Sequence, residues 1–269
     1  MRLIPYTQLG KFAFSLWVSY PSSGRVPEGA PKEFLIPSVE DEVDPKFVAL
    51  GMLWYVIFLF STTCHEAAHA WVAMRGGDHT ALNAGQVSLN PIPHIRREIF
   101  GTVLVPIFFF FTSGYMIGWA SAPYDPRWQD RYPKRAALMA LAGPLANLLL
   151  VLASGLFLYV GLRNGLFLPA YEGFSLAKAA PGVALGGFAQ LLSIMFMLNL
   201  ILFVFNLFPV PPLDGSTAIG LLLTDQQNRK WQSMMRAPGA MFIGILIAWN
   251  LFGTVFSPIL RFTVGILHP

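Results

Sequence analysis

Long apolar runs separated by short polar segments dominate the chain. Each run has about the 20 or more apolar residues that a helix needs to cross a bilayer. We therefore predict an all-α polytopic membrane protein with about four to six transmembrane segments. The runs are residues 47–74, 100–120, 136–162, 181–208 and 239–267.

The run at 100–120 contains Pro106 and Gly114, and its pattern fits two paths. It either crosses the membrane with a kink or enters and returns as a re-entrant segment. The polar segment at 76–98 begins with glycines that end a helix, and its composition predicts a loop with short extended pieces. Residues 1–46 combine a short apolar stretch with a Pro-rich and acidic one, which predicts an N-terminal interfacial or loop segment.

Composition places the chain among integral membrane proteins. Its 269 residues are 55% hydrophobic and 12% charged, with a mean hydropathy of +0.55, whereas soluble domains carry about 25% charged residues. The net charge of +4 fits loop Lys and Arg beside anionic lipid better than a nucleic-acid surface. We expect a lipid bilayer around the protein and no nucleic-acid partner.

The first apolar run carries a His-Glu-x-x-His motif, in which His65, Glu66 and His69 are ionisable groups at membrane depth. Such groups are costly in a bilayer and by default mark a function. Residues four apart share one face of a helix, so His65 and His69 can bind one metal ion while Glu66 acts as a general base. The alternative is a buried polar cluster that neighbouring helices satisfy.

A third ligand is expected from elsewhere, and Asp214 is the candidate. It is the only charged residue between positions 179 and 224, and it follows a proline-rich break after the fourth run. Two histidines and one carboxylate form a standard catalytic zinc set that leaves a position for water. The alternative roles for Asp214 are a helix cap or an ion-pair partner.

Three further residues are weaker candidates. His79 and His94 lie in the 76–98 loop, where either is a candidate ligand, although lone loop histidines are usually solvated. We keep His94 as a residue that contacts substrate or supports the structure. Asn147 is the strongly polar side chain of the third run, and its two readings are an interhelical hydrogen bond and a role near the site.

The chain resembles the site-2 protease family of intramembrane zinc metalloproteases, in particular the short bacterial and archaeal type without an evident PDZ or CBS domain. The resemblance implies that His65, His69 and Asp214 bind Zn²⁺, that Glu66 is the catalytic base, and that Asn206 binds or polarises the substrate carbonyl. Residues 47–269 would then be a single transmembrane metalloprotease domain. The motifs that carry the resemblance are HEAAH, AGPLAN and NLFPVPPLDG, supported by SLNPIPHI and FGTVLVP.

Two positions depart from the family pattern. Short members often have a lysine where this chain has Ser121, and many have an arginine shortly after the Asp-Gly pair, where this chain has Ser216 and Thr217. Neither departure removes a ligand or the base. They leave the subgroup and the substrate open.

The family plan also predicts topology. For the histidines and Asp214 to meet at one depth, their two helices should run parallel, so 100–120 should be re-entrant. If 100–120 instead crosses fully, the helix that carries Asp214 must unwind deep in the membrane. The re-entrant arrangement gathers ten basic residues on one face of the membrane. They are Arg75, Arg96, Arg97, Arg127, Arg131, Lys134, Arg135, Arg229, Lys230 and Arg236.

The resemblance implies hydrolysis of peptide bonds in or near transmembrane segments of membrane-protein substrates, in a prokaryotic cell (inner) membrane. Two other functions stay open on the sequence alone. One is a non-proteolytic membrane scaffold derived from such a protease. The other is a metal transporter, since ionisable residues within spans also mark ion paths.

Overall fold

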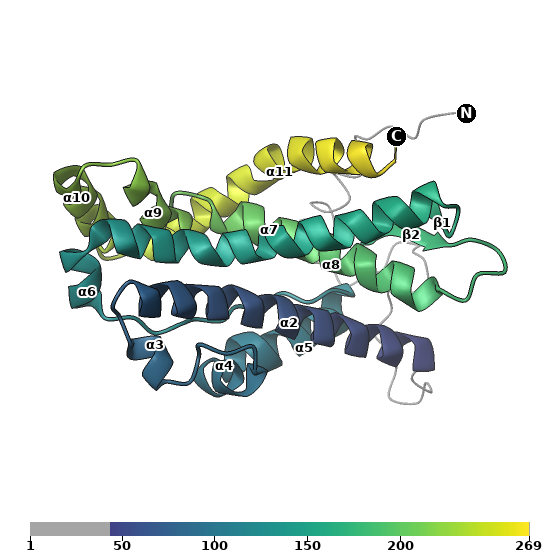
Figure 1. Cartoon of the computed structure of the whole chain (residues 1–269), viewed down its shortest axis with the longest axis horizontal. Helices are drawn as coiled ribbons and strands as arrows, with labels where there is room; N and C mark the ends of the chain where they lie inside the picture. The colour runs from purple at the N-terminus through teal and green to yellow at the C-terminus, as the bar shows by residue number, and fades with distance from the viewer. Residues whose placement is uncertain (1–43, 269) are drawn as a thin grey trace, which may run out of the picture.

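The computed structural model describes residues 44–268, and four of its helices are long and apolar enough to cross a membrane. They are α2 (Pro45–Arg75), α7 (Pro133–Arg163), α8 (Gly186–Asn206) and α11 (Ala240–Leu267) (Figure 1). This confirms the all-α polytopic membrane fold. Residues 1–43, most of the segment predicted to be interfacial, lie outside the described residues, and Pro45 already belongs to α2.

Shorter elements connect the long helices. The helical ones are α3 (Thr80–Asn83), α4 (Pro91–Arg97), the π-helix η2 (Phe100–Leu104), α5 (Val105–Ser113), α6 (Pro126–Arg131), α9 (Gly215–Ala218), the 3₁₀-helix η3 (Ile219–Leu221) and α10 (Asp225–Met235). The strands β1 (Phe167–Glu172) and β2 (Ser175–Ala179) form an antiparallel hairpin that pairs Phe167 with Ala179.

The prediction of extended pieces at 76–98 was wrong, because this segment contains α3 and α4 and no strand. Local capping explains the second helix. Pro91 occupies its first turn, and the Asn90 side chain accepts a hydrogen bond from the Ile92 N–H at 3.0 Å. The strands lie instead at 167–179, where Gly173 forms the turn with a φ of +57°.

Residues 100–120 form a hairpin that returns to its starting point. Its helical part has five residues in η2 and nine in α5, which gives about 21 Å, well short of a bilayer core of about 30 Å. Gly114 ends α5 in the left-handed conformation, and the chain then runs back until the Trp119 N–H donates to the Gly101 carbonyl at 3.1 Å. Of the two predicted paths, the re-entrant one is correct.

α6 and the start of α7 lie beside the end of α2. The carbonyl of Gly76, just after α2, accepts hydrogen bonds from Trp128 Nε1 and from Arg135, each at 3.0 Å. α7 therefore starts where α2 stops and runs back along it, and α8 then runs parallel to α2, as Figure 1 shows. The expected parallel arrangement of the two ligand-bearing helices is present.

Asp78 fastens the loop after α2 to the loop before α6. Its carboxylate accepts hydrogen bonds from the N–H and hydroxyl of Thr80 and from the N–H of Asp125, at 2.6–2.9 Å. Burial raises the pKa of Asp78, but these hydrogen bonds outweigh it and hold the pKa below its usual range.

A lowered pKa makes Asp78 a source of pH-dependent stability. A carboxyl whose pKa is lower in the folded state stabilises the fold fully above its unfolded pKa of about 4, and that contribution is lost as the pH falls through the folded pKa. We expect the melting temperature of the wild type to fall more between pH 5 and pH 3 than that of Asp78→Asn. Equal falls in thermal-unfolding scans would contradict this role.

Apolar clusters pack on both sides of a polar layer between α2, α7 and α8. One joins α2 to the re-entrant hairpin and α8 through Trp54, Phe58 and Phe110. The β-hairpin adds Phe174, whose ring lies 4.8 Å from Trp54 and 5.6 Å from Tyr115. The polar layer itself is buried and includes Ser61, Thr62, His65, Asn147 and Asn199.

Candidate metal centre

Three ligand atoms converge where α2 meets the turn after α8. His65 Nε2 and His69 Nε2 lie 3.0 Å apart, and Asp214 Oδ2 lies 3.1 Å and 3.3 Å from them. We call His65, His69 and Asp214 the ligand cluster. Zinc–nitrogen bonds of about 2.0–2.1 Å in a regular tetrahedron place ligand atoms about 3.3–3.4 Å apart, so the spacing fits zinc closely.

The hydrogen bonds of the two rings leave both Nε2 atoms free to bind a metal. His65 Nδ1 lies 2.6 Å from the side-chain oxygen of Asn147, and His69 Nδ1 lies 2.7 Å from the backbone carbonyl of Met139. These oxygens only accept, so each Nδ1 carries the proton and each Nε2 presents a lone pair. Two lone pairs and a carboxylate facing one point form a donor set that suits a cation.

Asp214 reaches this point because the chain unwinds after α8. Helix α8 ends at Asn206, and the turn that follows contains Pro209, Pro211 and Pro212. Asp214 occupies the N-cap position of α9, but its side chain makes no capping hydrogen bond and points to the histidines. Its position therefore agrees with the ligand reading rather than with the helix cap.

Gly143 provides the space for the cluster on the side of α7. A Cβ atom built on Gly143 would overlap with Nε2 of both His65 and His69. Only glycine lets the α7 backbone come this close to the two rings. The AGPLAN motif thus contributes a glycine that borders the cluster and, four residues later, Asn147, which holds His65.

The chain shares sequence with known proteins. The model of peptidase family M50 matches residues 172–251. A Bacillus subtilis protein named "Putative zinc metalloprotease YwhC" is 33% identical over 236 residues, which cover 83% of this chain and 97% of that protein. The chain belongs to peptidase family M50. This confirms the resemblance to site-2 proteases.

Other M50 relatives are more distant. "Putative zinc metalloprotease Rip2" of Mycolicibacterium smegmatis is 28% identical over 190 residues, covering 70% of this chain and 64% of that protein. The protein of the same name from Mycobacterium tuberculosis strain H37Rv is 28% identical over 200 residues, covering 74% of this chain and 68% of that protein. No solved structure matches the chain.

The remaining candidates of this M50 chain lie in different surroundings. Glu66 is buried beside the cluster, with 6% of its surface exposed. Asn206 is the last residue of α8 and is half-buried, and no hydrogen bond joins it to the cluster among the described residues. His79 is exposed, as expected for a loop histidine.

His94 departs from that expectation. It is buried, with 1% exposure, and its Nε2 bonds the Ser88 carbonyl at 3.1 Å. Within residues 44–268, the group of side chains suited to a metal consists of the ligand cluster alone, without His79 or His94. The solvated reading of His94 was therefore wrong, and the residue supports its own loop.

Lys134 at the start of α7 holds the segment that follows Asp214. Its ammonium group donates to the carbonyls of Gly220, Leu221 and Leu223, at 3.1, 2.9 and 2.5 Å. These carbonyls lie at the end of η3, where a helix leaves its acceptors unsatisfied. On the sequence alone, Lys134 was predicted only to be one of ten basic residues on one face of the membrane, and this contact was not predicted.

Lys134→Met is expected to lower the melting temperature by a few degrees, because three carbonyls exchange a charged donor for water at a net cost of about 0.5–1.5 kcal/mol. Lys230→Met on the exposed side of α10 is the matched control and should leave the melting temperature unchanged. Equal melting temperatures for the two variants would show that Lys134 does not brace this segment.

Proposed function

We propose that this M50 protein is a zinc metallopeptidase that hydrolyses peptide bonds in or near transmembrane segments of membrane-protein substrates. The observation that carries the proposal is the ligand cluster, two histidines and one carboxylate held within 4.8 Å of one another between apolar helices. The relatives named zinc metalloproteases support zinc as the ion.

The cluster, Glu66 and Asn206 have different roles in the proposed hydrolysis. Zinc held by the cluster would act as a Lewis acid and lower the pKa of a water towards about 7. Glu66, one residue from His65, takes a proton from the attacking water and returns it to the leaving amine. Asn206 donates a hydrogen bond to the oxygen of the scissile carbonyl, where negative charge develops.

The substrate would be a transmembrane helix. The carbonyls of a helix are hydrogen-bonded within it, so a substrate must unwind locally before water can attack. Helix-breaking residues near the cleavage site should therefore favour hydrolysis.

Charge supports one orientation in the membrane. α6, the start of α7 and α10 lie at one end of the helices in Figure 1, and among the described residues this end carries more Lys and Arg than the opposite one. The positive-inside rule places this end in the cytoplasm. The bacterial relatives make a prokaryotic cell membrane the proposed location.

The test is cleavage of a transmembrane substrate in bilayers by the purified protein. We expect cleavage that a zinc chelator stops and that added zinc restores. Zinc flux into sealed vesicles without cleavage would point to the transporter alternative. Bound zinc without cleavage of any membrane substrate would point to the scaffold.

A further inference from the structure

Buried amide and hydroxyl groups lead from His65 into the interior of the helix bundle. His65 Nδ1 lies 2.6 Å from Asn147 Oδ1, Asn147 Nδ2 donates to Asn199 Oδ1 at 2.8 Å, and Asn199 Nδ2 donates to Ser61 Oγ at 2.9 Å. We call these four residues the amide chain. Ser61, Asn147 and Asn199 have 0% exposure, so water does not compete for these bonds.

The direction of the amide chain matters to the metal. A neutral imidazole has one N–H and one lone pair, so His65 can offer Nε2 to a metal only when Nδ1 holds the proton. That requires an acceptor beside Nδ1. Asn147 presents an acceptor there only with its oxygen turned towards His65, because the reversed amide would present N–H donors and favour the tautomer that cannot bind.

The second end of Asn147 decides between its two orientations. Its Nδ2 faces Asn199, and this contact is a hydrogen bond only if Asn199 presents its oxygen. The orientation of the Asn199 amide must therefore be fixed as well. Its Nδ2 lies 2.8 Å from the backbone carbonyl of Met195, which can only accept. That carbonyl fixes the orientation of Asn199, and Asn199 fixes the orientation of Asn147.

We propose that Asn199 is a positioning residue for the metal centre. Its Nδ2 donates to the Met195 carbonyl, which turns its oxygen towards Asn147 and so turns the Asn147 oxygen towards His65 Nδ1. The proton of His65 then stays on Nδ1, and Nε2 is free to bind the ion. The proposal rests on the proposed function and deepens it. It also ties α8 to His65 of α2, because the residues that carry the effect come from α2, α7 and α8.

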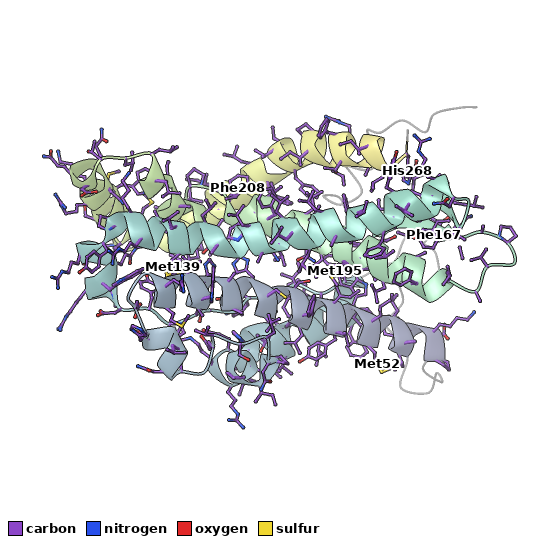
Figure 2. All side chains as sticks on the ribbon, in the orientation of Figure 1. Met52, Met139, Phe167, Met195, Phe208 and His268 are labelled. Carbon is purple, nitrogen blue, oxygen red and sulfur yellow. The ribbon has the colours of Figure 1, made fainter. Side chains whose placement is uncertain are left out.

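His69 offers an internal comparison. Its Nδ1 faces the carbonyl of Met139 directly at 2.7 Å, so its tautomer needs no amide in between. Figure 2 labels Met139 and Met195 along the boundary between α2 and its neighbours, with Met139 closer to the end of the bundle that carries α6. Changes at Asn199 should therefore affect His65 and leave the hydrogen bond of His69 intact.

The experiment compares four zinc-loaded full-length proteins. In Asn199→Leu, a side chain of similar volume replaces the amide, so both its acceptor oxygen and its N–H donors are lost. Asn199→Asp retains an oxygen that accepts from Asn147, and when protonated it also donates to the Met195 carbonyl. The control is Asn250→Leu on α11, where the exposed Asn250 amide donates to the Leu246 carbonyl of its own helix and has no other hydrogen bond within residues 44–268. Wild type completes the set.

Two quantities are measured. The zinc Kd from chelator competition should rise about 10–100-fold in Asn199→Leu and stay near the wild-type value in Asn199→Asp and Asn250→Leu. In proteins with ¹⁵N-labelled histidine, the downfield proton resonance of His65 Nδ1–H should be present in wild type and both of those variants, and shifted or lost in Asn199→Leu. A purely structural defect would not be rescued by aspartate.

Several outcomes would overturn the proposal. An unchanged zinc Kd and an unchanged His65 resonance in Asn199→Leu would do so, as would an equal loss in Asn199→Asp. If Asn199→Leu does not fold, Asn199→Ala also removes the acceptor for Asn147 and should show the same rise in Kd. Absence of zinc from the wild type would instead overturn the proposed function.

Discussion

Glu66→Gln is expected to lower the rate of peptide hydrolysis by about 10²–10⁴-fold while zinc stays bound, since general-base catalysis contributes about this much. Glutamine has nearly the shape of glutamate but cannot accept the proton of the attacking water. Glu66 is buried beside the cluster without belonging to it, so the ligand atoms are unchanged. The measurement is turnover of a membrane substrate together with zinc content.

The matched control is Glu98→Gln. Glu98 is half-buried, and its carboxylate accepts a hydrogen bond from Ser121 Oγ at the base of the re-entrant hairpin, outside the cluster. It should keep wild-type turnover. Turnover of Glu66→Gln within about threefold of wild type would remove Glu66 from the mechanism, and loss of zinc in this variant would assign it to metal binding.

Gly143→Ala is expected to remove zinc and activity together. The added methyl group would occupy the space of the two Nε2 atoms. α7 packs against both α2 and α8, so its backbone cannot easily move away from the rings. The rings of His65 and His69 must then move away from each other or from Asp214. We expect the zinc content of the purified protein to fall to near zero.

Gly253→Ala on α11 is the control for this substitution. A Cβ built on Gly253 meets no atom within 4 Å, and alanine favours a helix over glycine by about 1 kcal/mol. This variant should keep its zinc and be at least as stable as wild type. Zinc retained in Gly143→Ala would show that the close approach of α7 does not define the site.

The sequence was sufficient to predict the spans and the residues that form the cluster. The four long helices lie close to the predicted runs because length and apolar composition alone determine whether a helix can cross a bilayer. His65, His69 and Asp214 could be selected because an ionisable group among apolar residues is conspicuous. The parallel course of α2 and α8 followed from requiring these residues to meet.

The surroundings of the cluster were harder to predict, because they depend on contacts between distant residues. Asn199 is as polar as Asn147 and lies in an equally apolar helix, so the same signal was present and was overlooked. The roles of Gly143 and of the Met139 carbonyl could not be read from the sequence. A glycine in a helix can be present for several reasons. Every residue has a backbone carbonyl, so the residue type does not indicate which carbonyl accepts a hydrogen bond from a ligand.

Local structure in the polar segments was predicted least well. The extended pieces expected at 76–98 are short helices, and the strands at 167–179 lie between two predicted runs, in a segment for which no structure was predicted. Short elements depend on capping and turn residues such as Asn90 and Gly173, whose effects extend over a few positions.

The central claim is that one ion joins the motif of α2 to the turn after α8. The most direct measurement is the zinc content of the purified wild type beside Asp214→Ala and His65→Ala. The structure predicts about one zinc per chain in the wild type, from one set of three ligands, and its loss in both variants. Zinc retained at wild-type occupancy and affinity in Asp214→Ala would contradict the claim.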